Sequence, residues 1–272
     1  MISCSILKAA GALAIIGGLT LTQAAPKQPT LKSKKEQDAY MAIVNATDSD
    51  SRMKAVDDFL VKFADTELKS IALVIAAETA RSQNNFEKMI IYSERALEAD
   101  PENYQAMLML ATGIASRTRE FDLDKEEKLA KSEKYARSAL DLIAKAEKPN
   151  PNIPDEQWTA AKKDFVSSAH EALGLSALVR KKYDVASAEL KMAVEGSATP
   201  DQASMVRLAS AYNHAGKPDD AIAMIDKVLA LPDLNPQVKQ FAQAEKNNSI
   251  KLKSGGAKPP SAAPTQVEVK KP

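Results

Sequence analysis

The residues best suited to acid–base or metal chemistry in this 272-residue chain are two histidines, His170 and His214, which lie far apart in the sequence. A zinc or non-haem iron site generally needs three or four ligands at close spacing. Neither histidine has a second histidine or a carboxylate cluster at such a spacing. Glu171 follows His170, but neighbouring residues on a helix point about 100° apart. The sequence therefore predicts partly exposed helical histidines, no metal site and no cofactor.

Other residue patterns that support catalysis are absent from the sequence as well. The only cysteine, Cys4, lies close to the N-terminus, and no Gly-x-Ser-x-Gly elbow, phosphate-binding loop or dinucleotide fingerprint occurs. The densest carboxylates are Asp122, Asp124, Glu126 and Glu127. This run alternates with lysines and lacks the glycine and the terminal glutamate of a calcium loop, so it predicts the solvated start of a helix. We therefore expect a protein that is not an enzyme.

A repeated pattern of landmarks predicts the elements that carry these residues. One copy contains Leu173-Gly174, Lys182-Tyr183, Ala186 and Ala193-Val194, and the next contains Leu208-Ala209, Lys217-Pro218, Ala221 and Val228-Leu229, each displaced by 35 residues. Each copy predicts two amphipathic helices joined by a tight turn. A period of this size indicates an all-α solenoid of stacked helix pairs. Such folds offer extended surfaces, which favours binding over catalysis.

This pattern resembles the tetratricopeptide repeat (TPR), a unit of 34 residues in which small and large side chains alternate at the contact of two antiparallel helices. A third copy contains Ala76-Ala77 and Ala96-Leu97, but Met89 stands where a small residue is usual. We expect a looser helix contact there. A fourth copy runs from Leu110-Ala111 to Ala139-Leu140, with extra residues between its helices. The resemblance implies a right-handed superhelix of antiparallel helix pairs.

The array is expected to occupy residues 67–233 as about four repeats, with insertions near 116–128 and 146–166. A degenerate helix pair at 34–66 precedes it, a capping helix at 234–253 follows it, and 254–272 form a disordered tail rich in Pro, Ala and Lys. The lysines of the tail also allow contact with an acidic surface. A long helix is expected from Asp155 to Lys181. Its front end should protrude with Trp158 and Phe165 as a candidate specificity insert.

The N-terminal residues predict export. Residues 1–24 contain one basic side chain, Lys8, then an apolar stretch too short to cross a bilayer, and end in small residues. This indicates a signal peptide cleaved after Ala24, with a linker at 25–33; an uncleaved anchor is the alternative. Cys4 precedes the apolar stretch, so no lipobox is present. Loss of Lys8 leaves 36 basic and 36 acidic residues, which argues against nucleic acid as a partner. We expect a periplasmic or envelope protein.

The resemblance also implies which residues would face a partner, because the first helix of each repeat lines the concave groove in this family. The implied groove residues are Val74, Glu78, Arg81, Leu108, Thr112, Ala115, Glu171, Leu175, Leu178, Val206, Ser210 and Asn213. The alternative is that some of them, the leucines above all, only complete the packing between adjacent repeats. Family members that grip a C-terminal carboxylate use lysine and asparagine in the first of these sets. Val74 and Glu78 occupy those places here, so that binding mode is not expected.

The leading hypothesis is a noncatalytic scaffold of the bacterial envelope that binds a protein or peptide segment in the groove. A second hypothesis is a small-molecule or glycan receptor with Trp158 as its anchor. A third is an accessory subunit of an envelope assembly, a secretion complex or an enzyme, or a divergent catalytic domain. Self-association through exposed end faces is a further possibility.

Overall fold

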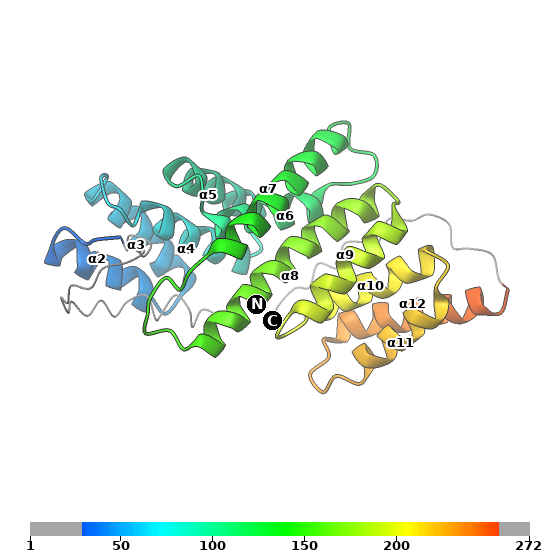
Figure 1. Cartoon of the computed structure of the whole chain (residues 1–272). Coiled ribbons are helices and arrows are strands. Elements are labelled where there is room, and N and C mark those ends of the chain that lie inside the picture. Colours follow the sequence, from blue (N-terminus) through cyan, green and yellow to red (C-terminus); the bar gives the residue numbers. More distant parts are fainter. Residues whose placement is uncertain (1–28, 256–272) are drawn as a thin grey trace. The chain divides into compact units, whose positions relative to one another are not determined.

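The computed structural model describes residues 29–255 (Figure 1). The expected signal peptide, its cleavage point after Ala24 and residues 256–272 of the expected tail lie outside the described residues. Within 29–255 every regular element is a helix, which confirms the predicted all-α fold of helix pairs. The helices, labelled as in Figure 1, are α2 (Lys34–Asn45), α3 (Ser49–Lys62), α4 (Lys69–Ser82), α5 (Phe86–Ala99), α6 (Tyr104–Arg117), α7 (Lys125–Lys145), α8 (Asp155–Val179), α9 (Tyr183–Gly196), α10 (Gln202–His214), α11 (Pro218–Leu229) and α12 (Pro236–Lys253).

The described residues form two compact units, one from 29–110 with 141–162 and the other from 111–140 with 163–255. In the first unit α2, α3, α4 and α5 pack in sequence order. Side-chain oxygens of Ser33, Asp48 and Asn85 cap the first turns of α2, α3 and α5, which satisfies backbone N–H groups that a helix start leaves unpaired. The core is built from the apolar faces of these helices around Phe59 and Leu73.

The looser contact expected between α4 and α5 is wrong. Met89 is buried and packs in one apolar cluster with Leu73 and Ala77 of α4. The small side chain of α5 lies one turn later, at Ser93, which is also fully buried and donates to the carbonyl of Met89 (2.8 Å). A large and a small residue have therefore exchanged places along α5, which preserves close packing.

In the second unit α9, α10, α11 and α12 also pack in sequence order, around one apolar cluster that includes Leu190, Leu208 and Ile225. At the α8–α9 crossing, a Cβ added to Gly174 would lie 2.7 Å from Cγ of Leu190. Because Gly174 has no side chain, the side chain of Leu190 can pack directly against the α8 backbone. The close packing of α8 against α9 therefore requires the glycine with which the repeat pattern begins, Gly174.

Three turns between paired helices share one geometry. The second residue after the helix has a left-handed backbone at Asn84 (φ 56°), Lys181 (φ 58°) and Gly216 (φ 77°). The next N–H bonds a carbonyl five residues back, as in Asn85 to Ala80 and Lys217 to Tyr212, both 2.8 Å. This Schellman geometry closes a helix and turns the chain sharply. It repeats in α4–α5, α8–α9 and α10–α11, so the three pairs are equivalent units.

Candidate functional site

Most residues expected in a groove are buried inside the chain. The buried members are Val74, Leu108, Ala115, Leu175, Leu178, Val206, Ser210 and Asn213. Val74 belongs to an apolar cluster of the first unit, and Leu175, Leu178 and Val206 belong to that of the second. The first helices are covered on most sides, because each packs against its own pair and against neighbouring elements. We do not carry these eight side chains forward as contacts for a partner.

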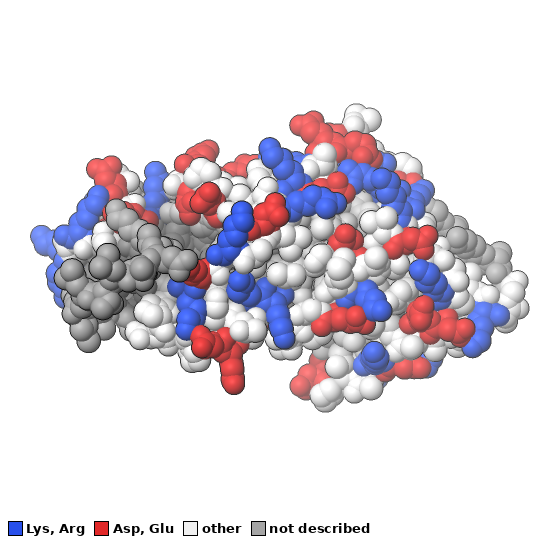
Figure 2. Space-filling view, viewed as in Figure 1, with Lys and Arg blue, Asp and Glu red and all other residues white. Residues whose placement is uncertain are grey.

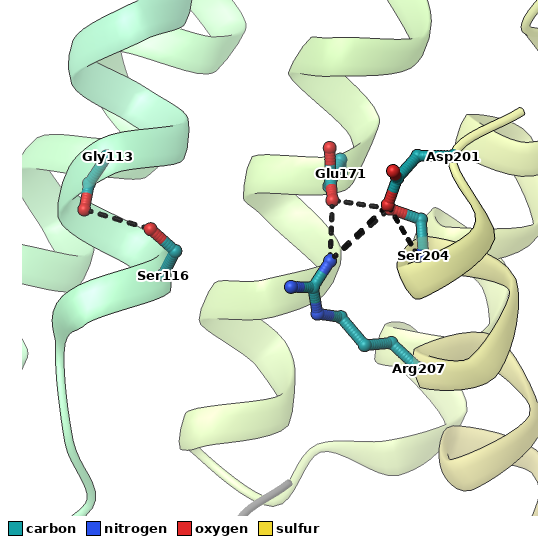
Figure 3. A network of polar contacts seen from close by, with 6 residues as sticks. All are labelled: Gly113, Ser116, Glu171, Asp201, Ser204 and Arg207. Carbon is teal, nitrogen blue, oxygen red and sulfur yellow. Dashed lines mark hydrogen bonds and ion pairs between the residues drawn. The ribbon is translucent and has the colours of Figure 1, made fainter. Parts of the chain in front are cut away.

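Half-buried positions among the expected groove residues are Glu78, Arg81, Thr112 and Glu171. Glu171, on α8, accepts hydrogen bonds from two side chains of α10 (Figure 3): the hydroxyl of Ser204 at 2.5 Å and Nη1 of Arg207 at 3.0 Å. The side chains of Glu171 and Arg207 are only 25% and 19% exposed. The N-cap Asp201 accepts from the backbone N–H of Ser204 (2.9 Å) and so aligns the start of α10. This network joins one repeat to the next.

Asn213 has a similar structural role at the end of α10. Its side-chain amide donates to Oε1 of Glu245 (2.6 Å) and to Oγ of Ser249 (2.8 Å), both on α12. Asn213 is fully buried. The capping helix therefore supplies the acceptors for the amide N–H groups of this asparagine, while its Oδ1 is buried without a hydrogen-bond partner. Full burial of the side chain keeps it away from a partner at the surface.

The other two charged groove candidates, Glu78 and Arg81, lie on α4 in the first unit. Burial raises the pKa of the Glu78 carboxyl, and the positive charges of Arg81 and Arg52 act in the opposite direction. Removal from water disfavours the charged form, while nearby guanidinium groups favour it. Glu78 is thus a half-buried carboxylate whose charge is favoured by two nearby arginines, and a half-buried charged side chain is suited to a polar contact with a partner.

The expected specificity insert is packed into the chain. Phe165 and Trp158 are buried, and Nζ of Lys162 lies 6.0 Å from the centroid of the Trp158 ring. The same ammonium donates to the carbonyl of Ala146 (3.2 Å). The face of the indole is therefore covered by a cation of its own helix. This arrangement gives no support to Trp158 as an open anchor for a glycan.

Both histidines serve helix packing. Nδ1 of His170 lies 2.8 Å from Oε2 of Glu189, which joins α8 to α9. The ring of His214 stacks on Tyr183 at a centroid distance of 4.5 Å. In residues 29–255 no group of three or more His, Cys, Asp or Glu side chains is placed to hold a metal ion. Over the same range, none of the helices has the length and apolar character needed to cross a bilayer.

The loop between α6 and α7 carries exposed apolar residues that the sequence patterns did not single out. Phe121 is 87% exposed and Leu123 is fully exposed. The insertion itself was apparent from the repeat spacing, but the composition of the loop gave no sign that these two side chains would point outward. Elsewhere, the face shown in Figure 2 mixes basic and acidic residues, in keeping with a net charge of +1.

Comparison with known proteins agrees with this architecture. Residues 72–103, which span α4 and α5, match the tetratricopeptide repeat family model. The helix pairs define a repeat-type α-solenoid, and its α4–α5 pair is similar to the tetratricopeptide repeat. Proteins of this family generally act as noncatalytic scaffolds that bind protein partners. No curated protein matches the chain at a significant level.

Three solved structures share a distant likeness. A thermophilic TPR protein of Thermus thermophilus is 19% identical, covers 77% of this chain and 98% of its own, with a TM-score of 0.47. An assembly chaperone of RpL4 is 10% identical, with coverages of 82% and 98% and a TM-score of 0.46. A tetratricopeptide repeat protein from Parabacteroides merdae is 16% identical, with coverages of 81% and 91% and a TM-score of 0.37. We draw no functional argument from likenesses at this distance.

Proposed function

We propose that this protein is an exported, noncatalytic scaffold of the bacterial periplasm or envelope that binds a protein or peptide segment. The observation that carries the proposal is the α4–α5 repeat. It matches the family model and keeps two charged side chains, Glu78 and Arg81, half-buried at first-helix positions. The side chains of Glu171 and Asn213, by contrast, form hydrogen bonds to neighbouring helices. The α4 surface is therefore the part of the expected groove where charged side chains can meet a partner.

The test is enrichment of partners from a native envelope extract on the immobilised protein. Glu78→Ala with Arg81→Ala removes one acid and one base from α4. The matched control is Lys191→Ala with Glu195→Ala, which removes an exposed pair of α9 with the same net charge. We expect a partner that the wild type and the control retain equally and that the α4 variant retains at least about tenfold less, the effect of about 1.4 kcal/mol of binding free energy. Equal retention by all three proteins would contradict the α4 site, and no specific partner would contradict the scaffold.

Export has a separate test. The arrangement of Lys8, the apolar stretch and Ala24 supports a cleaved signal peptide. Mass spectrometry of the protein purified from its own cells is expected to find Ala25 as the first residue, in the fraction released from the periplasm or envelope. A chain that begins at Met1 and remains with the cytoplasmic fraction would contradict export.

A further inference from the structure

Glu78 and Arg81 differ from the other charged side chains of residues 29–255 in their polar contacts. Every other Asp, Glu, Lys or Arg side chain of that range that is buried or half-buried has a polar partner within the chain, as Arg52 has in the carbonyl of Ala46. Glu78 and Arg81 are half-buried, yet neither forms a hydrogen bond or an ion pair with a described residue. A polar group that is partly removed from water without a partner is costly. These two side chains are therefore suited to bonding a group from outside the chain.

The two side chains offer a donor and an acceptor side by side. They lie three residues apart on α4, and side chains at this spacing are neighbours on a helix surface. The guanidinium of Arg81 can only donate hydrogen bonds, and the ionised carboxylate of Glu78 can only accept them. Although their charges attract each other, the two groups form no ion pair. Both therefore keep hydrogen-bonding capacity for the same incoming group.

The charges at this surface favour an uncharged partner group. A cation that approached Glu78 would meet the positive charges of Arg81 and Arg52, which both act on this carboxyl. An anion that approached Arg81 would meet the carboxylate of Glu78. Like charges brought together at close range repel, and the repulsion suppresses such partners. An uncharged group with both an N–H donor and a C=O acceptor satisfies Glu78 and Arg81 without either repulsion.

The amide group has this combination of donor and acceptor. In an extended peptide the N–H and the C=O of one residue point to the same side, which is why opposite residues of paired strands exchange both of their hydrogen bonds. The side chains of Asn and Gln contain the same two kinds of atom. A main-chain amide pair is present at every second residue of an extended segment, whatever its side chains are.

We propose that Glu78 and Arg81 bind an uncharged amide of an extended partner segment, in its main chain or in an Asn or Gln side chain. The amide N–H donates to the carboxylate of Glu78, and the amide C=O accepts from the guanidinium of Arg81. The proposal rests on the scaffold function proposed above and names the chemical group that the α4 surface recognises. Because the bound group is uncharged, the affinity depends little on salt concentration.

The test uses the full chain and synthetic peptides of the partner segment, which is the stretch of the enriched partner that the immobilised protein protects from protease. In one set of peptides each main-chain amide in turn is replaced by an ester, which removes one N–H donor. In a second set each Asn and Gln in turn is replaced by Ala. Calorimetry measures the affinity of every peptide for wild type, for Glu78→Ala and for the control Glu195→Ala, which removes an exposed carboxylate of α9.

We expect one replacement to weaken binding to wild type and to the control at least about tenfold, and to weaken binding to Glu78→Ala less than about twofold, because the acceptor of that N–H is already absent. A sensitive ester identifies a main-chain amide as the bound group, and a sensitive Asn or Gln identifies a side-chain amide. Raising the salt concentration from about 0.05 M to about 0.5 M should change the wild-type affinity less than about threefold.

Replacements that act equally on wild type and Glu78→Ala would overturn the amide and leave the scaffold standing. A fall in affinity of about tenfold or more at the higher salt concentration would indicate a charged partner group and would also overturn it. The salt dependence needs only the wild-type chain, so it decides the question even if circular dichroism shows that Glu78→Ala is unfolded. If the immobilised wild type retains no protein, both the amide and the scaffold are contradicted.

Discussion

The network around Glu171 and the loop at 118–124 lie in the same unit and are both rich in charged residues. The charged side chains of the network join two helices, whereas those of the loop surround exposed apolar side chains. Between α8 and α10 the charges face each other and hold two helices together, with Arg207 3.0 Å from Glu171. In the loop, carboxylates pair with lysines of α7 and of the α8–α9 turn, and the apolar side chains between them face solvent. Polar residues in this protein therefore indicate structure where they face a neighbouring helix. Phe121 and Leu123, in contrast, face solvent and contribute little to the packing of the unit.

The largest effect is expected at Asn213. Asn213→Leu removes both amide donors, so Glu245 and Ser249 keep only their contacts within α12 and lose the hydrogen bonds that join α12 to α10. We expect a loss of about 2 kcal/mol in the free energy of unfolding, measured by urea denaturation, because buried polar groups left unpaired cost about 1–3 kcal/mol. The control Asn247→Leu changes an exposed amide of α12 and should stay within about 0.5 kcal/mol of wild type. Equal losses in the two variants would refute the structural role of Asn213.

A smaller effect is expected for the pair of Glu171 and Arg207. A double-mutant cycle with Glu171→Ala and Arg207→Ala should give a coupling of about 1 kcal/mol, at the upper end for partly exposed ion pairs. The exposed pair Lys191 and Glu195, 3.9 Å apart on α9, should give a coupling near zero in the same assay. Additive losses at Glu171 and Arg207 would mean that the network does not join the repeats.

These two predictions mark the limit of what the sequence could provide. The helix pairs and turns followed from local patterns, such as the landmarks Gly174 and Ala209, and the long helix expected from Asp155 to Lys181 is observed as Asp155–Val179. The partners of Glu171 and Asn213 lie about one repeat away, so no local pattern could assign them. The exchange of Met89 and Ser93 was not predicted because the usual small-residue position was assumed to hold in α5, whereas the buried small side chain lies one turn later. Phe121 and Leu123 are of residue types that are normally buried, so their exposure could not be predicted from the sequence.

A change of at most about 1 kcal/mol is expected for Lys181→Gly. Glycine relieves the left-handed backbone, which costs other residues about 1–2 kcal/mol, but it gains more entropy on unfolding. The variant should therefore be as stable as wild type or slightly more stable, while the Arg119 amide exchanges with solvent faster because Glu120 has lost its partner. Asn84→Gly alters the equivalent turn of α4–α5 and should leave that amide unchanged. Equal exchange rates of the Arg119 amide in wild type and Lys181→Gly would show that Lys181 does not stabilise the loop.

The hydrogen bond between the Arg119 N–H and Asp122 should be lost only at acidic pH, with a modest effect on the loop. The hydrogen bond from the Arg119 N–H lowers the pKa of Asp122 below its ordinary value of 3.8, and Lys128 adds to this. A carboxyl with a depressed folded-state pKa contributes its stabilisation above the unfolded-state pKa and loses it as the pH falls through the lower value. The Arg119 amide resonance should therefore stay constant from neutral pH to about 4 and shift only below it. A midpoint above 3.8 would contradict the contact.

The central claim is that the side chains of Phe121 and Leu123 contribute almost nothing to the stability of the folded chain and are accessible at its surface. The most direct measurement is the free energy of unfolding of the double variant Phe121→Ser, Leu123→Ser. Because both side chains are already in water, the value should lie within about 0.5 kcal/mol of wild type. A loss of more than about 1 kcal/mol would show that the pair packs within the chain, as a partly buried apolar residue would, and would contradict the account.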